Sequence, residues 1–141
     1  MKQLYKLSVI IFLSLSFFSC VADEEEISTQ DLLFGKWKTT SYTENGITPN
    51  DFTNCDYERT VEFSDNEITF VDFMLDDTNT DCIINETYSF DYELINDSLF
   101  KIIRPNGMVL ENEILALSST ELKIKATVND VAEETTFERI Y

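Results

Sequence analysis

Hydrophobic and polar positions alternate along most of the chain after residue 35, in short runs separated by turn residues. This pattern is typical of β-strands, because successive side chains of a strand point to opposite faces. The clearest run is 84–95, whose apolar face carries Ile84, Tyr88, Phe90, Tyr92 and Leu94. We predict eight strands, at residues 36–44, 56–64, 67–75, 84–95, 99–104, 108–117, 121–128 and 131–141.

The segments between these strands are short and contain turn-forming pairs such as Asn45-Gly46 and Asn129-Asp130. Short connections pair each strand antiparallel with the next, and closing the sheet removes exposed edges. We therefore predict an all-β fold, an eight-stranded antiparallel up-and-down barrel. The alternation changes phase within 67–75 and within 108–117, where we expect β-bulges. Ser28 can cap a short helical turn that Gly35 would end.

The first nineteen residues have the organisation of an export signal. Two lysines precede an apolar run at 7–18, which is too short for an ordinary transmembrane helix. The following Ser19-Cys20 resembles the lipobox of bacterial lipoproteins, in which the cysteine is acylated, for example with palmitate, and becomes the N-terminus. The resemblance implies a signal peptide at 1–19 and a lipid on Cys20. A plain secretory signal cleaved nearby is the alternative.

Residues 20–30 contain an acidic cluster and no apolar periodicity, so we expect a flexible tether before a domain at 31–141. The acidic tract at 23–26 resembles the signal that sends lipoproteins to the cell surface in some Gram-negative phyla. It implies a protein anchored by lipid in the outer membrane and exposed on the surface. An ordinary solvated tether is the other interpretation.

The chain is strongly acidic, with 27 acidic and 10 basic residues and a formal net charge of −17. Loss of Lys2 and Lys6 with the signal peptide would take this charge to −19. Binding to nucleic acid needs lysines and arginines against phosphates, so we expect no nucleic-acid partner. A basic protein or a cation fits this charge better.

Three cysteines are an odd number, and assigning Cys20 to the lipid leaves Cys55 and Cys82 as one pair. Export would place both thiols in an oxidising compartment, where a disulfide persists. Loop closure between these positions would stabilise the fold by about 3–4 kcal/mol. We predict a Cys55–Cys82 disulfide.

The residue types argue against catalysis and a bound cofactor. The chain has no histidine, which excludes Ser-His-Asp and Cys-His catalysis and every histidine-ligated metal site. Asp77, Asn79 and Asp81 have the spacing of a calcium loop, but Cys82 stands where that loop needs glycine. An ordinary polar hairpin explains this segment better. We expect a protein that is not an enzyme and holds no cofactor or metal.

Gly35-Lys36-Trp37, at the start of the first predicted strand, resembles the G-x-W signature of lipocalins. With the surrounding LLFGKWKTTSYTENG, the cysteine pair and the terminal TTFERIY, residues 32–141 are similar to small bacterial lipocalin-like lipoproteins. The resemblance implies that Trp37 closes the base of the barrel and that Arg139 packs across it as a cation–π contact. The alternative for Trp37 is an ordinary core aromatic.

Aromatic residues are the main candidates for a binding function. Phe73, Phe100 and Phe137 lie in predicted strands, as do six aromatics that could line a pocket: Tyr57, Phe63, Phe70, Tyr88, Phe90 and Tyr92. In a lipocalin-like barrel they would surround a small apolar or amphipathic molecule. They could equally fill a solid core, because filled and hollow barrels share the same alternation. The rival function is an acidic interaction or inhibitor module that engages a basic protein and holds no ligand.

Overall fold

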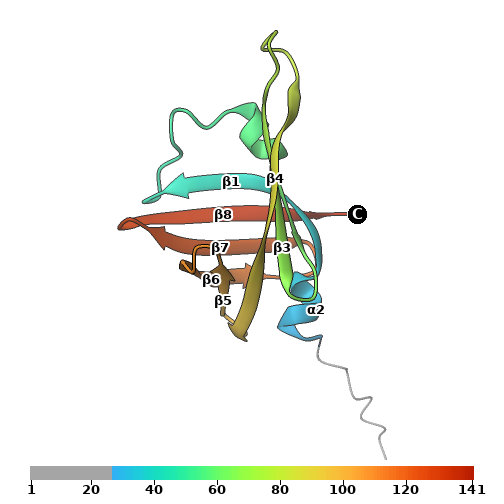
Figure 1. Ribbon diagram of the computed structural model, residues 1–141, viewed down its shortest axis with the longest axis vertical. Coiled ribbons are helices and arrows are strands. Elements are labelled where there is room, and N and C mark those ends of the chain that lie inside the picture. The colour runs from blue at the N-terminus through green and yellow to red at the C-terminus, as the bar shows by residue number, and fades with distance from the viewer. Residues whose placement is uncertain (1–26) are drawn as a thin grey trace, which may run out of the picture.

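A computed structural model of the protein describes residues 27–141 and confirms the predicted fold, a closed antiparallel barrel with strands in the order of the chain (Figure 1). A short helix, α2 (Thr29–Leu33), precedes the barrel. The strands are β1 (Gly35–Glu44), β2 (Thr60–Phe63), β3 (Glu67–Leu75), β4 (Cys82–Asn96), β5 (Leu99–Ile103), β6 (Val109–Leu117), β7 (Glu121–Val128) and β8 (Val131–Ile140). The predicted signal peptide, Cys20 and the acidic tract lie outside the described residues.

Helix α2 begins at Thr29, so the last two residues of the predicted tether, 29 and 30, belong to the helix. The Ser28 side chain caps it by accepting a hydrogen bond from the Asp31 amide at 3.1 Å, as the sequence suggested. Within residues 27–141, no helix has the length and apolar character needed to cross a bilayer.

The second strand is shorter than predicted. Of the segment 56–64, only β2 is extended, and a 3-10 helix, η1 (Asn54–Glu58), precedes it. The Asp56 carboxylate accepts hydrogen bonds from the Thr53 amide at 2.6 Å and from its hydroxyl at 2.8 Å. These local bonds offer the backbone an alternative to the sheet, so the chain turns here before it enters the barrel wall.

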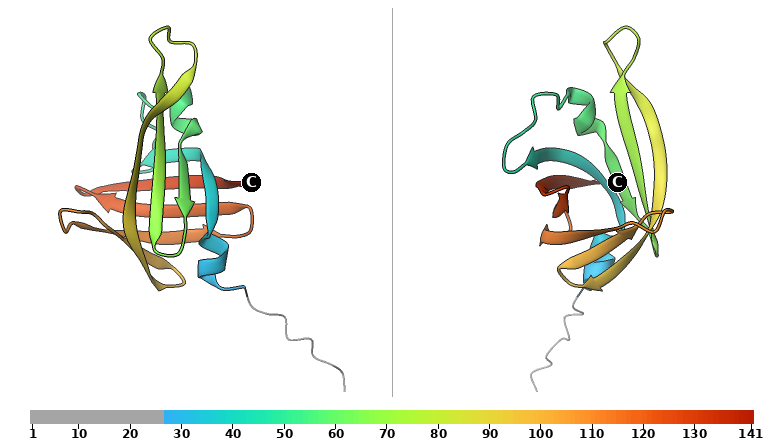
Figure 2. Two further views of the ribbon diagram at one scale, coloured as in Figure 1. Left: turned by 45° about the vertical axis from the view of Figure 1, so that its right-hand side comes forward. Right: turned by 60° about the vertical axis from the view of Figure 1, so that its left-hand side comes forward.

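Strand pairing is irregular at four places. Register shifts occur where β3 meets β4 at Asp72/Phe73 and where β6 meets β7 at Ile114/Ala116, in the two regions where bulges were predicted. Two others, in the pairings β1–β8 and β4–β5, were not predicted. Bulges increase the local bend of a strand. In two further views β4 curves strongly between its two ends (Figure 2).

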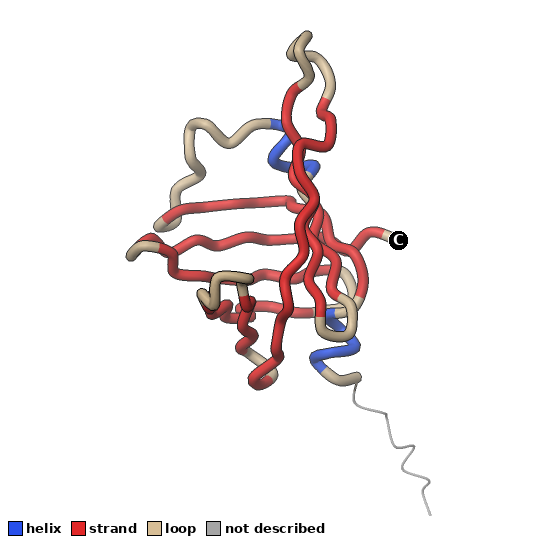
Figure 3. Tube along the Cα trace, in the orientation of Figure 1, coloured by secondary structure: helices blue, strands red, loops and turns tan. Residues whose placement is uncertain are grey.

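The two ends of the barrel differ in structure. At the base, α2 packs under the barrel, and Leu33, Trp37, Phe63, Phe100 and Leu122 are fully buried. The mouth is the end that carries the connections after β1, β3, β5 and β7, and there the β3–β4 hairpin extends beyond the other strands (Figure 3). The Cα partners of β5 on β4 begin at Asp91, so the part of β4 before Asp91 rises above the β5 wall.

Candidate functional site

The base is closed by the predicted pair of Trp37 and Arg139. These residues are cross-strand partners on β1 and β8, and the Arg139 Cζ lies 4.1 Å from the centroid of the Trp37 ring. The guanidinium donates hydrogen bonds to the carbonyl of Phe34 at 2.5 Å and to that of Leu32. The Trp37 Nε1 donates to the Leu33 carbonyl at 2.8 Å. This cluster ties α2 to the barrel and plays a structural role.

Gly35 is required by the same arrangement. Its φ is +115°, and a Cβ added to it would lie 2.7 Å from the Arg139 Nη1. A side chain at this position would therefore be strained and would also collide with the guanidinium. The conformation explains why glycine precedes Trp37 by two positions in this chain.

Above the base, the lower half of the barrel is filled by aromatic rings. The Phe63 ring meets those of Tyr92 and Phe100 edge to face, with centroids 5.3 and 5.6 Å apart. Phe63 and Tyr92 are buried in this core, and neither lines the cavity described next. For these two residues the filled-core alternative describes the structure.

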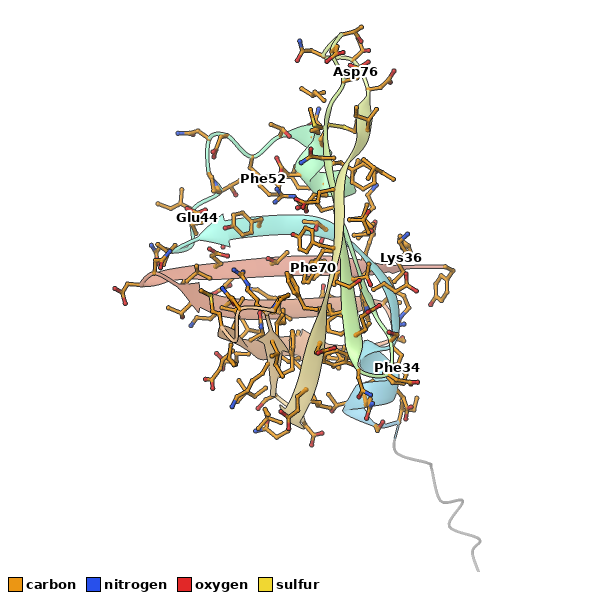
Figure 4. The ribbon with its side chains drawn as sticks, in the orientation of Figure 1. Phe34, Lys36, Glu44, Phe52, Phe70 and Asp76 are labelled. Carbon is orange, nitrogen blue, oxygen red and sulfur yellow. A yellow bond between two sulfur atoms is a disulfide. The ribbon has the colours of Figure 1, made fainter. Side chains whose placement is uncertain are left out.

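Between the filled half and the mouth lies a cavity of about 260 Å³, which we call the mouth cavity. Its floor and walls are formed by Thr39, Tyr42, Phe52, Arg59, Thr60, Val61, Phe70, Asp72, Tyr88, Phe90, Ile102, Arg104, Glu133, Thr135 and Phe137. Three of the predicted aromatics, Phe70, Tyr88 and Phe90, belong to this set. In Figure 4, Glu44 marks the mouth end of β1, and Phe52 lies on the connection that follows it.

Tyr57 lies outside the lining of the mouth cavity. It belongs to η1 and not to a strand, and its side chain is partly exposed. Its ring packs edge to face on Phe52, with centroids 4.9 Å apart. Tyr57 therefore packs against Phe52, a residue of the cavity wall, without lining the cavity itself.

An ion-pair network occupies one wall of the cavity. The Arg59 guanidinium contacts the carboxylates of Asp56 at 3.0 Å and Asp72 at 3.2 Å. The Tyr88 hydroxyl donates a hydrogen bond to Asp72 at 3.0 Å. Burial, together with the Asp72 charge, raises the pKa of Tyr88 to about 12, so the hydroxyl stays protonated at neutral pH. Both oxygens of Asp72 are thus engaged by groups of the protein.

Two glutamates face each other where β1 pairs with β8. Glu44 and Glu133 are direct cross-strand partners, and the Tyr42 hydroxyl donates to Glu44 at 3.0 Å. Burial and the Glu44 charge raise the pKa of Glu133. The ring of Tyr42 stacks on that of Phe52, with centroids 5.4 Å apart. Stacked rings and carboxyl groups therefore share this side of the mouth.

Arg104 follows β5 at the mouth and is exposed to solvent. Its Cζ lies 5.9 Å from the Phe90 ring centroid, and its backbone is held by a tight turn to Met108. Across residues 27–141, no carboxylate comes within ion-pair distance of its guanidinium. It differs in this respect from Arg59.

The predicted disulfide joins Cys55 and Cys82, with Cα atoms 5.4 Å apart. It links η1 to the first residue of β4. The bridge fastens two segments at the mouth.

The calcium candidate loop is organised by its neighbour Asp76, at the tip of the β3–β4 hairpin (Figure 4). The Asp76 carboxylate accepts hydrogen bonds from the amides of Thr78 and Thr80 and from the Thr78 hydroxyl, and these bonds lower its pKa. In the part of the chain that the structure describes, no three His, Cys, Asp or Glu residues gather closely enough to hold a metal. Asp77, Asn79 and Asp81 lie in the turn between β3 and β4, whose backbone amides at Thr78, Thr80 and Asp81 bond to Asp76.

Comparison with known proteins agrees with this architecture. Residues 33–124 match the family described as lipocalin-like domain, which covers more than half of the chain. The chain belongs to this family. A search of curated proteins finds no match.

Solved structures are similar to this chain at low sequence identity, including the following three. Bovine odorant-binding protein in complex with a selenium-containing odorant is 13% identical, with a TM-score of 0.49 over 79% of this chain and 73% of that one. A redesigned β-barrel is 15% identical, with a TM-score of 0.49 over 82% and 98%. A Schistosoma mansoni fatty acid binding protein in complex with arachidonic acid is 13% identical, with a TM-score of 0.39 over 81% and 100%.

The lining residues predicted from the sequence are all aromatic, and they omit the polar side of this lipocalin-like interior. Arg104 and Glu133 also line the cavity. Their signal was present in the alternation: Glu133 and Thr135 have the same parity as the buried Phe137, and Arg104 has that of Ile102. Following the inward parity beyond the last apolar residue would have found them.

Proposed function

We propose that this lipocalin-like domain binds a small apolar or amphipathic molecule in the mouth cavity. The observation that carries the proposal is a space of about 260 Å³ above a filled base, with rings contributed by β3, β4 and β8. The volume lies just below the range of about 300–1,000 Å³ found for typical ligand pockets, so we propose a small ligand.

The cavity also favours binding over the rival function. An interaction module that recognises a basic protein through its acidic surface needs no internal space, and a solid core would serve it better. Here the lower half is packed and the upper half is hollow, with aromatic and charged residues gathered around the hollow. We therefore assign the function to the interior and propose binding in place of catalysis.

We further propose that the protein is anchored to the outer membrane by a lipid on Cys20 and exposed on the cell surface. The support is the order of a charged segment, an apolar run and Ser19-Cys20, followed by an acidic tract. In the described part of the chain, α2 enters at the base, at the opposite end from the mouth (Figure 1). An anchor upstream of α2 would leave the mouth directed away from the membrane.

Filling the cavity tests the proposed binding. Thr135 lines the cavity from β8, and the next residue, Thr136, has the opposite parity on the same strand. We expect the purified wild type to bind 2-naphthalenemethanol, a small neutral amphipath, in isothermal titration calorimetry. Thr135→Phe should weaken binding at least about tenfold, or about 1.4 kcal/mol, by occupying the space. Thr136→Phe should leave the affinity within about twofold.

A bound molecule should also raise the unfolding temperature of the wild type, because a ligand that binds only the folded state stabilises it. The proposal fails if 2-naphthalenemethanol, fatty alcohols, fatty acids and quinones all leave both the heat signal and the melting curve unchanged. It also fails if Thr135→Phe binds as tightly as Thr136→Phe.

A further inference from the structure

Two pairs of stacked aromatic rings stand at the walls of the mouth cavity. The Phe70 ring stacks on that of Tyr88 at 5.3 Å between centroids and an interplanar angle of 19°, and Phe90 lies 5.5 Å from Tyr88. On the β1 side, Tyr42 and Phe52 stack in the same manner, at 14°. Planar rings pack best against other planar rings in stacked or edge-to-face arrangements. These walls therefore favour a flat aromatic ligand over a flexible chain.

The charges around the cavity are not equivalent. Arg59 is held by Asp56 and Asp72, and Asp72 also accepts the Tyr88 hydroxyl, so these groups are already occupied. Arg104 is a cation without a carboxylate partner among the described residues, in a chain where acids outnumber bases by 27 to 10. Its guanidinium can bind a carboxylate through two parallel hydrogen bonds.

Glu133 is the remaining charged group of the lining. It faces Glu44 across the β1–β8 pairing, and both burial and this neighbour oppose its ionisation. Glu133 therefore already neighbours a second acidic side chain, whereas Arg104 is a permanent cation with no carboxylate within ion-pair distance in residues 27–141. Of the two groups, Arg104 is better suited to select the ligand.

We propose that the mouth cavity selects small aromatic carboxylates, whose ring lies against Phe70, Tyr88 and Phe90 while the carboxylate pairs with Arg104 at the mouth. This inference rests on the proposed binding function and specifies its ligand class. The exposed position of Arg104 suits a head group that stays partly in water while the ring is buried.

Four probes of similar size separate the contribution of the aromatic ring from that of the carboxylate: 2-naphthoate, 2-naphthalenemethanol, 2-naphthylmethylamine and decanoate. In calorimetry at neutral pH and low salt, we expect 2-naphthoate to bind the purified full chain at least about tenfold more tightly than each of the others. Its affinity should fall as salt is added, because an exposed ion pair is screened. The neutral alcohol should show little dependence on salt.

Substitutions of two nearby cations, Arg104 and Lys101, test whether the preference for 2-naphthoate depends on Arg104. Arg104→Gln should weaken 2-naphthoate about tenfold and leave 2-naphthalenemethanol within about twofold, and Arg104→Lys should recover part of the loss. Lys101→Gln removes the same charge from β5, where Lys101 pairs with Glu111 outside the cavity lining, and should have little effect on either probe.

The outcomes distinguish this inference from the proposed function. If the alcohol, the amine or decanoate binds as tightly as 2-naphthoate, or if Arg104→Gln and Lys101→Gln behave alike, the ligand class is wrong and binding in the cavity stands. If none of the four probes binds, the ligand class is wrong, and the proposed function fails with it if fatty alcohols and quinones also leave the heat signal and the melting curve unchanged.

Discussion

At the scale of single residues, the base of the barrel depends on the absence of a side chain. Gly35 combines a φ of +115° with a guanidinium 2.7 Å from the place of its missing Cβ. The sequence was sufficient to locate this glycine and its tryptophan, because both stand at the boundary between a helical turn and a strand. It did not show that Arg139 also satisfies carbonyls at the end of α2, since these contacts join residues more than 100 positions apart.

Substitution of Gly35 provides a prediction at this scale. Gly35→Ala should lower the free energy of unfolding by about 2–4 kcal/mol, through backbone strain and collision with Arg139. Gly46→Ala is the matched control, because Gly46 also has a positive φ, +83°, but meets no atom within 4 Å of the added Cβ. It should cost only about 1–2 kcal/mol. Denaturant unfolding measures both.

A double-mutant cycle isolates the collision in this prediction. In an Arg139→Gln background the cost of Gly35→Ala should fall, with a coupling of about 0.5–3 kcal/mol. If the costs of Gly35→Ala and Gly46→Ala are equal and no coupling to Arg139 is found, the guanidinium is not the reason for glycine at this position.

At the scale of elements, the segments at the mouth are held by contacts other than strand pairing. β2 spans four residues, and η1 replaces the predicted first half of that strand. Alternation could predict the strands but not η1, because its cause is a local capping arrangement between Thr53 and Asp56. The disulfide then ties η1 to β4, and Arg59 reaches from the end of η1 to Asp72 on β3.

The disulfide provides a prediction for these elements. Replacing both Cys55 and Cys82 by serine should lower the free energy of unfolding by about 3–4 kcal/mol, as expected for a loop closed over 27 residues. Reductant should destabilise the wild type by a similar amount and leave the double variant unchanged, which serves as an internal control. A wild-type unfolding midpoint that does not respond to full reduction would contradict the structure at this point.

At the scale of the whole molecule, the interior is divided into a packed half and a hollow half. The sequence predicted the barrel and its base, but it could not predict this division. Phe63 and Tyr92 in the core have the same alternation as Phe70 and Phe90 at the cavity, and they differ in their position along the strands: Phe63 pairs with Ile68, two residues before Phe70 on β3. Ile84 shows a related limit: it has the sequence alternation of Tyr88 and Phe90, but the register shift before Glu86 pairs it with Phe73, and it is 61% exposed.

The orientation of the whole molecule depends on where the chain is anchored, which gives the last prediction. If Cys20 is acylated, metabolic labelling with a palmitate analogue should mark the protein and retain it in the membrane fraction, because several acyl chains hold far more firmly than one. Cys20→Ser should abolish both labelling and retention. The Cys55→Ser/Cys82→Ser variant is the matched control, because it removes the other cysteines and should still be labelled. Labelling that persists in Cys20→Ser, or a native protein that is never labelled, would exclude the lipid anchor. In that case the mouth would have no fixed direction relative to the membrane, although the cavity and its proposed ligand would be unaffected.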